Sequence, residues 1–165
     1  MVRSVPGGTF LLLLVVLLSA AGCGRKTMIV PPQTLVPAPV DDLEYSFTEY
    51  GVRLSWSFPQ KTVAGNSLKQ IDGFELLRAE IPIKDYCAGC PQPFGLPVEI
   101  QGNVLPDDGS GRTASYVDNS LRRGYHYIYK VRARAGRWGT SRDSNRVGFD
   151  WNPSGPVSAP AAAGP

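Results

Sequence analysis

The sequence is poor in the residues on which most enzymes depend. Its 165 residues include one histidine and three cysteines. General acid–base and nucleophilic catalysis need several such side chains within hydrogen-bond reach, and the chain has no G-x-S-x-G motif. A zinc site needs four ligands, and His126 is the only histidine that the sequence offers in addition to the cysteines. The sequence therefore predicts no catalytic residues, no metal and no cofactor, and we expect a protein that is not an enzyme.

Long hydrophobic runs are scarce too. The one clear run, Phe10 to Leu18, follows Arg3 and precedes the small residues of "SAAG". This order is that of the n-region, h-region and cleavage site of a secretory signal. The run is too short to cross a hydrocarbon core of about 30 Å, which needs roughly 20 apolar residues. We therefore expect residues 1–22 to be a signal peptide.

Cys23 stands directly after this signal. The stretch "AAGC" resembles the lipobox of bacterial lipoproteins, with Ala20 where the pattern prefers Leu. The resemblance implies that Cys23 becomes the mature N-terminus and carries a diacylglycerol and an N-linked acyl chain such as palmitate. More than one chain holds a protein stably on a membrane. In such lipoproteins an Asp after the cysteine signals retention in the inner membrane. Gly24 occupies that position here, so the resemblance favours the outer membrane.

Proline-rich segments flank the rest of the chain. We expect residues 23–37 to form an extended tether behind the lipidated cysteine, and residues 152–165, rich in Pro, Ala and Gly, to be a disordered tail. The opening "CGRK" with Pro31 and Pro32 is also faintly similar to small lipoproteins of lipopolysaccharide-transport machinery. We expect the remaining residues, 38–151, to form a single domain.

No convincing amphipathic helix appears within this domain, and its apolar residues alternate with polar ones. Val52, Leu54 and Trp56 alternate with Arg53 and two serines, as expected for a strand with one buried face. The pattern predicts an all-β fold. The expected strands are residues 43–50, 51–58, 74–81, 96–104, 113–118, 125–135 and 145–151.

The segments "PAPVDDL", "VRLSWSFP", "IDGFELLRAE", "YVDNSLRRGYHYIYKVRA" and "SRDSNRV" together resemble a fibronectin type III domain. The resemblance runs from about residue 37 to 151 and implies an immunoglobulin-like, seven-stranded β-sandwich. It places Trp56 in the core, and Leu121 and Tyr127 in a tyrosine corner. The segment "PIKDYCAGCPQPFGLP", after the third strand, is long for this family.

Cys87 and Cys90 lie in that long segment with C-x-x-C spacing. Haem attachment needs a histidine after the second cysteine, where Pro91 stands. A thioredoxin-like site needs a helix N-terminus in an α/β fold. Export to an oxidising compartment, with Cys23 lipidated, favours a local disulfide. A redox couple is the alternative.

Basic residues recur on one face of the expected strand 125–135. Lys130, Arg132 and Arg134 share this face, with Arg142 and Arg146 expected on the following strand. Such a stripe either contacts an anionic surface or acidic protein, or is an ordinary solvated face. We favour the solvated face.

His126 has the same outward register and is expected to be a solvated surface side chain. Arg137 and Trp138 fall in the predicted turn "GRWG". They either contact a partner or fold back over the sheet, and the sequence does not separate the two.

These expectations combine into a non-catalytic lipoprotein of the cell envelope. It would present a fibronectin type III-like binding or spacer module to an envelope protein or an anionic envelope polymer. The net charge is only +3, and with export this argues against nucleic acid as a partner. The alternatives are a redox or enzyme-accessory protein that uses the cysteine pair, and an assembly factor for lipopolysaccharide transport.

Overall fold

A computed structural model describes residues 35–106, 108–136 and 139–152. Its regular structure is almost entirely β, with one short 3-10 helix, η1 (Ile83–Asp85). No helix within the described ranges is both long and apolar enough to cross a membrane.

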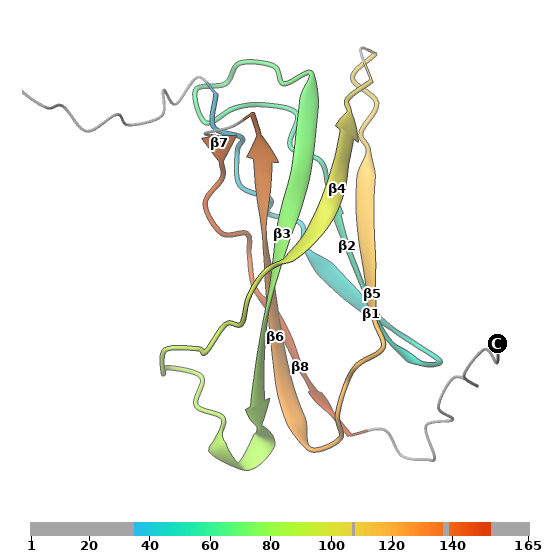
Figure 1. Cartoon of the computed structure of the whole chain (residues 1–165), viewed down its shortest axis with the longest axis vertical. Coiled ribbons are helices and arrows are strands. Elements are labelled where there is room, and N and C mark those ends of the chain that lie inside the picture. Colours follow the sequence, from blue (N-terminus) through green and yellow to red (C-terminus); the bar gives the residue numbers. More distant parts are fainter. Residues whose placement is uncertain (1–34, 107, 137–138, 153–165) are drawn as a thin grey trace, which may run out of the picture. The chain divides into compact units, whose positions relative to one another are not determined.

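Eight strands form two antiparallel sheets (Figure 1). The bounds of all strands follow: β1 (Glu44–Thr48), β2 (Gly51–Ser57), β3 (Gln70–Pro82), β4 (Val98–Val104), β5 (Thr113–Asp118), β6 (Tyr125–Ala135), β7 (Gly139–Thr140) and β8 (Val147–Trp151). The smaller sheet has the order β1-β2-β5. The larger has the order β4-β3-β6-β7, and β8 also pairs with β6. This arrangement is that of a fibronectin type III-like β-sandwich, which confirms the predicted fold class.

The core lies between the inner faces of the two sheets. Val52 and Leu54 are fully buried and Trp56 is 1% exposed, while Arg53 and Ser57 on the opposite face of β2 are exposed. The Trp56 ring meets Phe74 of the facing sheet edge to face, with 5.4 Å between ring centroids. Burial of such a ring supplies much of the hydrophobic stabilisation. Trp56 thus occupies the core position implied by the resemblance.

The tyrosine corner is present at the start of β6. The hydroxyl of Tyr127 accepts a hydrogen bond from the backbone N–H of Arg122 at 2.7 Å. Leu121, partly buried, packs against the core beside it. The corner ties the β5–β6 connection to the end of the sheet.

One expectation of burial is wrong at the first strand. Alternation predicts that Leu43, Tyr45 and Phe47 all face the core, yet only Leu43 is buried, and Tyr45 and Phe47 are 37% and 56% exposed. Their rings do lie against Phe149, at 4.9 and 5.2 Å. However, β1 is the last strand of its sheet, so no neighbouring strand covers them.

The chain enters and leaves the domain at opposite ends. The carbonyl of Leu35 lies beside Gly139, which pairs with Ala135 at one end of β6. Trp151 pairs with Tyr125 at the other end. The 11 residues of β6 separate the two ends by about 35 Å. We call them the entry end, with Leu35, and the exit end, with Trp151.

Candidate functional site

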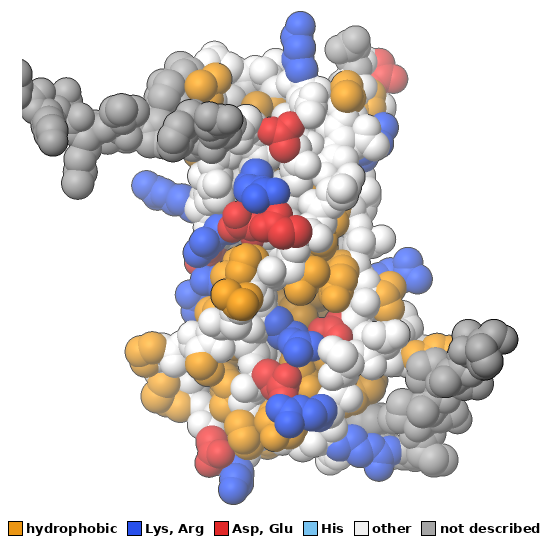
Figure 2. Space-filling model, in the orientation of Figure 1, with side chains coloured by type: hydrophobic (Ala, Val, Ile, Leu, Met, Phe, Trp, Pro, Cys, Tyr) orange, Lys and Arg blue, Asp and Glu red, His pale blue; other side chains and the backbone are white. Residues whose placement is uncertain are grey.

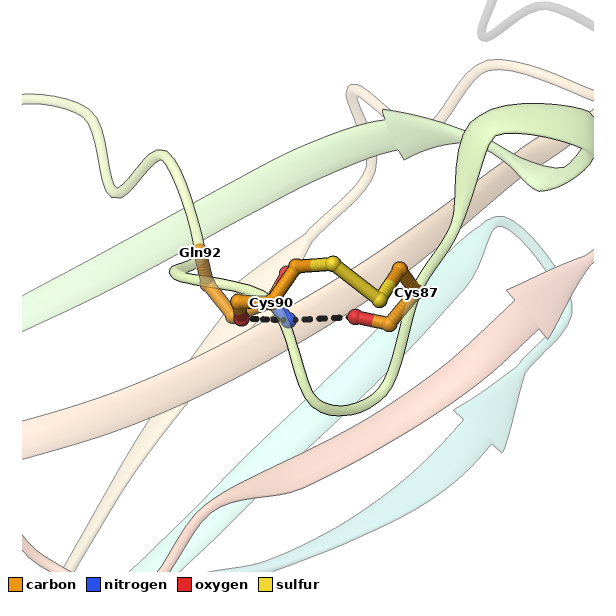
Figure 3. The surroundings of a disulfide bond; sticks show 3 residues. All are labelled: Cys87, Cys90 and Gln92. Carbon is orange, nitrogen blue, oxygen red and sulfur yellow. Dashed lines mark hydrogen bonds between the residues drawn. A yellow bond between two sulfur atoms is a disulfide. The ribbon is translucent and has the colours of Figure 1, made fainter.

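The segment between β3 and β4 is closed by the Cys87–Cys90 disulfide (Figure 3). The backbone N–H of Cys90 donates to the carbonyl of Cys87, so the two cysteines bracket a tight turn. Gln92 donates through its side-chain amide to both cysteine carbonyls, at 3.0 and 2.8 Å. The predicted disulfide is confirmed, and it holds the turn in an exposed loop and not at the start of a helix.

This loop folds back over the outer face of the larger sheet. The ring of Tyr86 stacks on that of His126, with 3.6 Å between centroids and 19° between planes. His126 Nδ1 lies 2.6 Å from a carboxylate oxygen of Asp150 on β8. His126 is therefore only 9% exposed, and the prediction of a solvated histidine is wrong. Its outward register was right, but the inserted loop covers it.

Lys130 is covered in the same way. Its ammonium lies 4.0 Å from the ring centroid of Phe94, which comes from the same loop, and 2.7 Å from Asp143. Lys130 is 7% exposed, so it does not belong to a solvated basic stripe. A bridge between Ala79 and Phe94, and a bond from the N–H of Gly95 to the carbonyl of Arg78, complete the docking of the loop.

Two other basic residues of this face are paired with acids. Arg132 contacts Asp143 at 2.5 Å, and Arg134 contacts Glu99 at 2.6 Å. Figure 2 shows Lys and Arg side chains interspersed with Asp and Glu over this part of the surface. Arg142 and Arg146 were expected on a strand but precede β8, which begins at Val147. The stripe is thus largely a set of ion pairs, each worth little where exposed.

The ion pairs with Lys130 and Arg132 change the pKa of the Asp143 carboxyl. Partial burial alone would raise the pKa of its carboxyl, but hydrogen bonds from Lys130 and Arg132 outweigh this and hold the pKa below its ordinary value. The carboxylate therefore stays ionised at neutral pH and anchors both cations.

A cleft of about 430 Å³ opens beside the loop, between β3 and β5. Asp118, at the end of β5, lies in its floor with only 4% of its side chain exposed. Its carboxylate accepts hydrogen bonds from the guanidinium of Arg78 at 2.8 Å and the hydroxyl of Tyr129 at 2.9 Å. The backbone N–H and hydroxyl of Ser120 donate at 2.9 and 2.7 Å. This network joins the two sheets.

The pKa values of the network reflect its charge pattern. Burial acts to raise the pKa of Asp118, but the bonds from Ser120, Arg78 and Tyr129 prevail and lower it. Burial and the neighbouring Asp118 carboxylate raise the pKa of Tyr129 well above its ordinary value. Tyr129 therefore remains a hydrogen-bond donor throughout the physiological range.

The exit end joins three segments through their backbones. The N–H of Ile83 donates to the carbonyl of Gly124, and the N–H of Gly124 donates to the carbonyl of Trp151, each at 3.0 Å. Gly124 has a φ of +79°, which favours glycine at this position. The inserted loop, the β5–β6 connection and the end of β8 therefore form one continuous surface.

That surface carries apolar, basic and acidic side chains, which lie together at the lower end of Figure 2. Its acidic member is Asp85, which is exposed next to Lys84. Ile83 and Tyr86 are each 37% exposed, and Lys84 and Arg123 are exposed beside them. Within the described ranges, neither of these two cations forms an ion pair. Arg122 lies over the ring of Tyr125 at 4.2 Å and also contacts Glu80.

Three predicted site residues, Cys23, Arg137 and Trp138, lie outside the described residues. Asp118 and Arg78 were not singled out from the sequence. The motif "DNS" was the available signal for Asp118, because an Asp two residues before a Ser often accepts its backbone N–H. Nothing in the sequence indicated that Arg78, forty residues earlier, would meet it.

In the part of the chain that the structure describes, no three His, Cys, Asp or Glu residues are grouped to hold a metal ion. His126 contacts Tyr86 of the inserted loop and a carboxylate oxygen of Asp150 on β8.

Comparison with known proteins gives the fold a context. No protein-family model matches the chain, and no curated protein sequence matches it either. The third fibronectin III domain of human KIAA0343 protein aligns at 13% identity over 82% of this chain and 99% of that domain, with a TM-score of 0.48. The twitchin kinase region from C. elegans aligns at 16% identity over 72% of this chain, with a TM-score of 0.46.

The chain spans only 17% of the twitchin structure. Likeness at this level gives no information on activity or partners, and the fold assignment stands on the strand order described above.

Proposed function

We propose that this protein is a lipid-anchored, non-catalytic lipoprotein of the cell envelope whose sandwich domain binds an acidic partner through its exit end. The anchor rests on the sequence: a short apolar run, small residues and Cys23 in lipobox order. The outer membrane is the proposed site, since Gly24 follows the cysteine. An envelope protein or an anionic envelope polymer is the proposed partner.

The observation that carries the binding role is the continuous surface at the exit end. Backbone bonds through Gly124 join its three segments, so the backbone that carries its apolar and basic side chains is ordered before any partner arrives. Pre-ordered surfaces lose less entropy on binding. Apolar contacts supply affinity, and cations such as Lys84 and Arg123 steer an acidic partner.

The position of this surface also suits an anchored protein. The tether of residues 23–37 joins the domain at the entry end, about 35 Å from the exit end along β6. Attachment of the tether therefore leaves the exit end unobstructed. The alternative roles in redox chemistry and lipopolysaccharide transport have no comparable support among the described residues.

Photo-crosslinking in the native envelope tests this proposal. A photoreactive amino acid in place of Arg123 is expected to capture a specific partner, because Arg123 is exposed within the proposed surface. The same probe in place of Lys61, exposed near the entry end, is the positional control and is expected to capture little.

Charge reversal then tests the chemistry of recognition. Lys84→Glu should reduce capture from position 123 severalfold, whereas Lys69→Glu, which makes the same charge change just before β3 at the other end, should not. Equal capture from positions 123 and 61, or equal loss with both reversals, would show that the exit end is not the binding surface.

A further inference from the structure

Strand β1 has an exposed edge. It is the last strand of its sheet, and no strand among the described residues pairs with its outer side. The Asn145 side chain bonds the backbone N–H and carbonyl of Leu43 just before the strand, and the outer side of Glu44–Thr48 lies beyond that contact. All five residues, "EYSFT", pair continuously with β2 from Glu44 to Thr48, so no bulge interrupts the strand. It contains no Lys and no Pro. Exposed edge strands normally carry such features to prevent pairing with another chain.

Two aromatic side chains lie along this edge. Tyr45 and Phe47 are 37% and 56% exposed, although their rings contact each other and Phe149 below. A neighbouring strand would cover both. Exposed aromatic residues that already rest on a rigid core are well suited to an interface, because their side chains lose little freedom on binding.

We propose that β1 pairs antiparallel with β1 of a second copy of this chain, across a twofold axis through Ser46. In a continuous sheet, paired residues point to the same face, so each residue must pair with one an even number of positions away. The register centred on Ser46 is the one that pairs all five residues of β1. The result is a six-stranded sheet in which two three-stranded sheets meet at β1.

This register makes β1 self-complementary. Tyr45 of each copy lies opposite Phe47 of the other, which creates two cross-strand aromatic pairs. Glu44 lies opposite Thr48, so the only charged residue of β1 does not face itself. A register centred on Tyr45 would instead leave Phe47 and Thr48 without partners in β1, and one centred on Phe47 would do the same to Glu44 and Tyr45.

Charge complementarity across the dimer supports the same register. Arg53 of β2 is paired with Ser46 and forms no ion pair among the described residues. With strands about 4.8 Å apart and a rise of about 3.4 Å per residue, its Cα lies about 12 Å from that of Glu44 of the second copy. Both side chains are exposed on the same face and can meet over that span. Symmetry forms this contact twice.

The antiparallel dimer also allows both copies to be anchored to one membrane. The entry ends of the two copies lie at opposite ends of the dimer. Val36 and Pro37 already pair with the domain, so the free tether is residues 23–35. When extended it reaches about 40 Å, more than the roughly 35 Å length of a domain. Dimerisation therefore does not depend on the anchor and does not conflict with it.

A cysteine placed on the twofold axis tests the dimer. In full-length protein in isolated membranes or detergent, Ser46→Cys should form an intermolecular disulfide on mild oxidation, because paired strands bring the two Cα atoms within the 4.4–6.8 Å that a disulfide spans. We expect a reducible species of twice the monomer mass to become the main product.

Ser115→Cys is the matched control. Ser115 is an exposed serine on the same face, but it lies on β5, two strands away from β1. It should give less than a tenth of the dimer, and it also reports any exchange with Cys87 and Cys90. Adding Phe47→Lys to Ser46→Cys should abolish the dimer while leaving the thermal midpoint nearly unchanged, since Phe47 is more than half exposed.

Three outcomes would overturn the proposal. They are no dimer with Ser46→Cys, equal dimer with Ser115→Cys, or a Ser46→Cys product whose mass shows a different protein or an intramolecular bond. A dimer that survives Phe47→Lys would likewise show that the aromatic pairs do not form.

Discussion

Replacing Asp118 by alanine is expected to lower the free energy of unfolding by about 3 kcal/mol. The carboxylate is almost fully buried and accepts bonds from Arg78, Tyr129 and Ser120. Its loss leaves the Tyr129 phenol without its acceptor and removes the buried acceptor of the Arg78 guanidinium, which keeps only Ser120 and Glu80. Unpaired buried donors are costly. The estimate is at the low end for buried pairs because Arg78 is about a third exposed.

Urea denaturation at pH 7 measures this loss. Asp41→Ala is the control, because Asp41 is exposed and should change stability by less than about 0.5 kcal/mol. If Asp118→Ala were as stable as Asp41→Ala, the network would not join the sheets.

The same network predicts how stability depends on pH. The folded pKa values of Asp118 and Asp143 lie below the value of 3.8 for a free carboxyl. Their stabilisation is complete above that value and is lost as the pH falls through the folded pKa values. Stability should therefore fall as the pH drops below 3.8 and through the folded pKa values, and less steeply in Asp118→Ala. An identical acid limb in both proteins would argue against this role.

Truncating Trp56 to alanine should cost about 3–5 kcal/mol. The indole is 1% exposed and contacts Phe74 of the opposite sheet, so its removal leaves a large cavity between the sheets. Trp56→Phe keeps most of the apolar volume and should cost less than about 1.5 kcal/mol. No protein group in the described ranges accepts a hydrogen bond from the indole N–H of Trp56. The change to phenylalanine therefore breaks no hydrogen bond to a described residue.

Denaturant titration with circular dichroism separates these variants. Tyr50→Ala serves as the exposed aromatic control, since Tyr50 is 46% exposed in the β1–β2 turn. A Trp56→Ala protein with the stability of Tyr50→Ala would mean that the core is not centred on this residue.

The architecture could be predicted because local alternation and tertiary burial agree along most strands. In β2, the apolar residues are those that meet the other sheet. Agreement fails where a strand has no neighbour: Tyr45 and Phe47 alternate correctly but remain exposed at an edge. Whether such side chains are covered depends on the order of strands in the sheet, and a local sequence pattern does not contain that order.

The candidate site was less predictable for a related reason. The outward register of His126 and Lys130 was evident from the pattern, but the alternation of apolar and polar residues does not show that a loop covers them. Tyr86 and Phe94 reach these residues from a loop that is closed by the disulfide and Gln92 and docked on β3 through Ala79 and Arg78. Asp118 and Arg78 meet across forty residues of sequence, and pairings of that kind follow from topology.

The state of Cys23 in the native protein tests the central claim most directly. Mass spectrometry of the N-terminal peptide, extracted from membranes of the source cells, should show a chain that begins at Cys23 and carries a diacylglycerol and an N-linked acyl chain. Cys23→Ser should then leave the membrane fraction. A mature chain that begins elsewhere without lipid, or a Cys23→Ser protein that stays stably membrane-bound, would contradict the account of an anchored binding module.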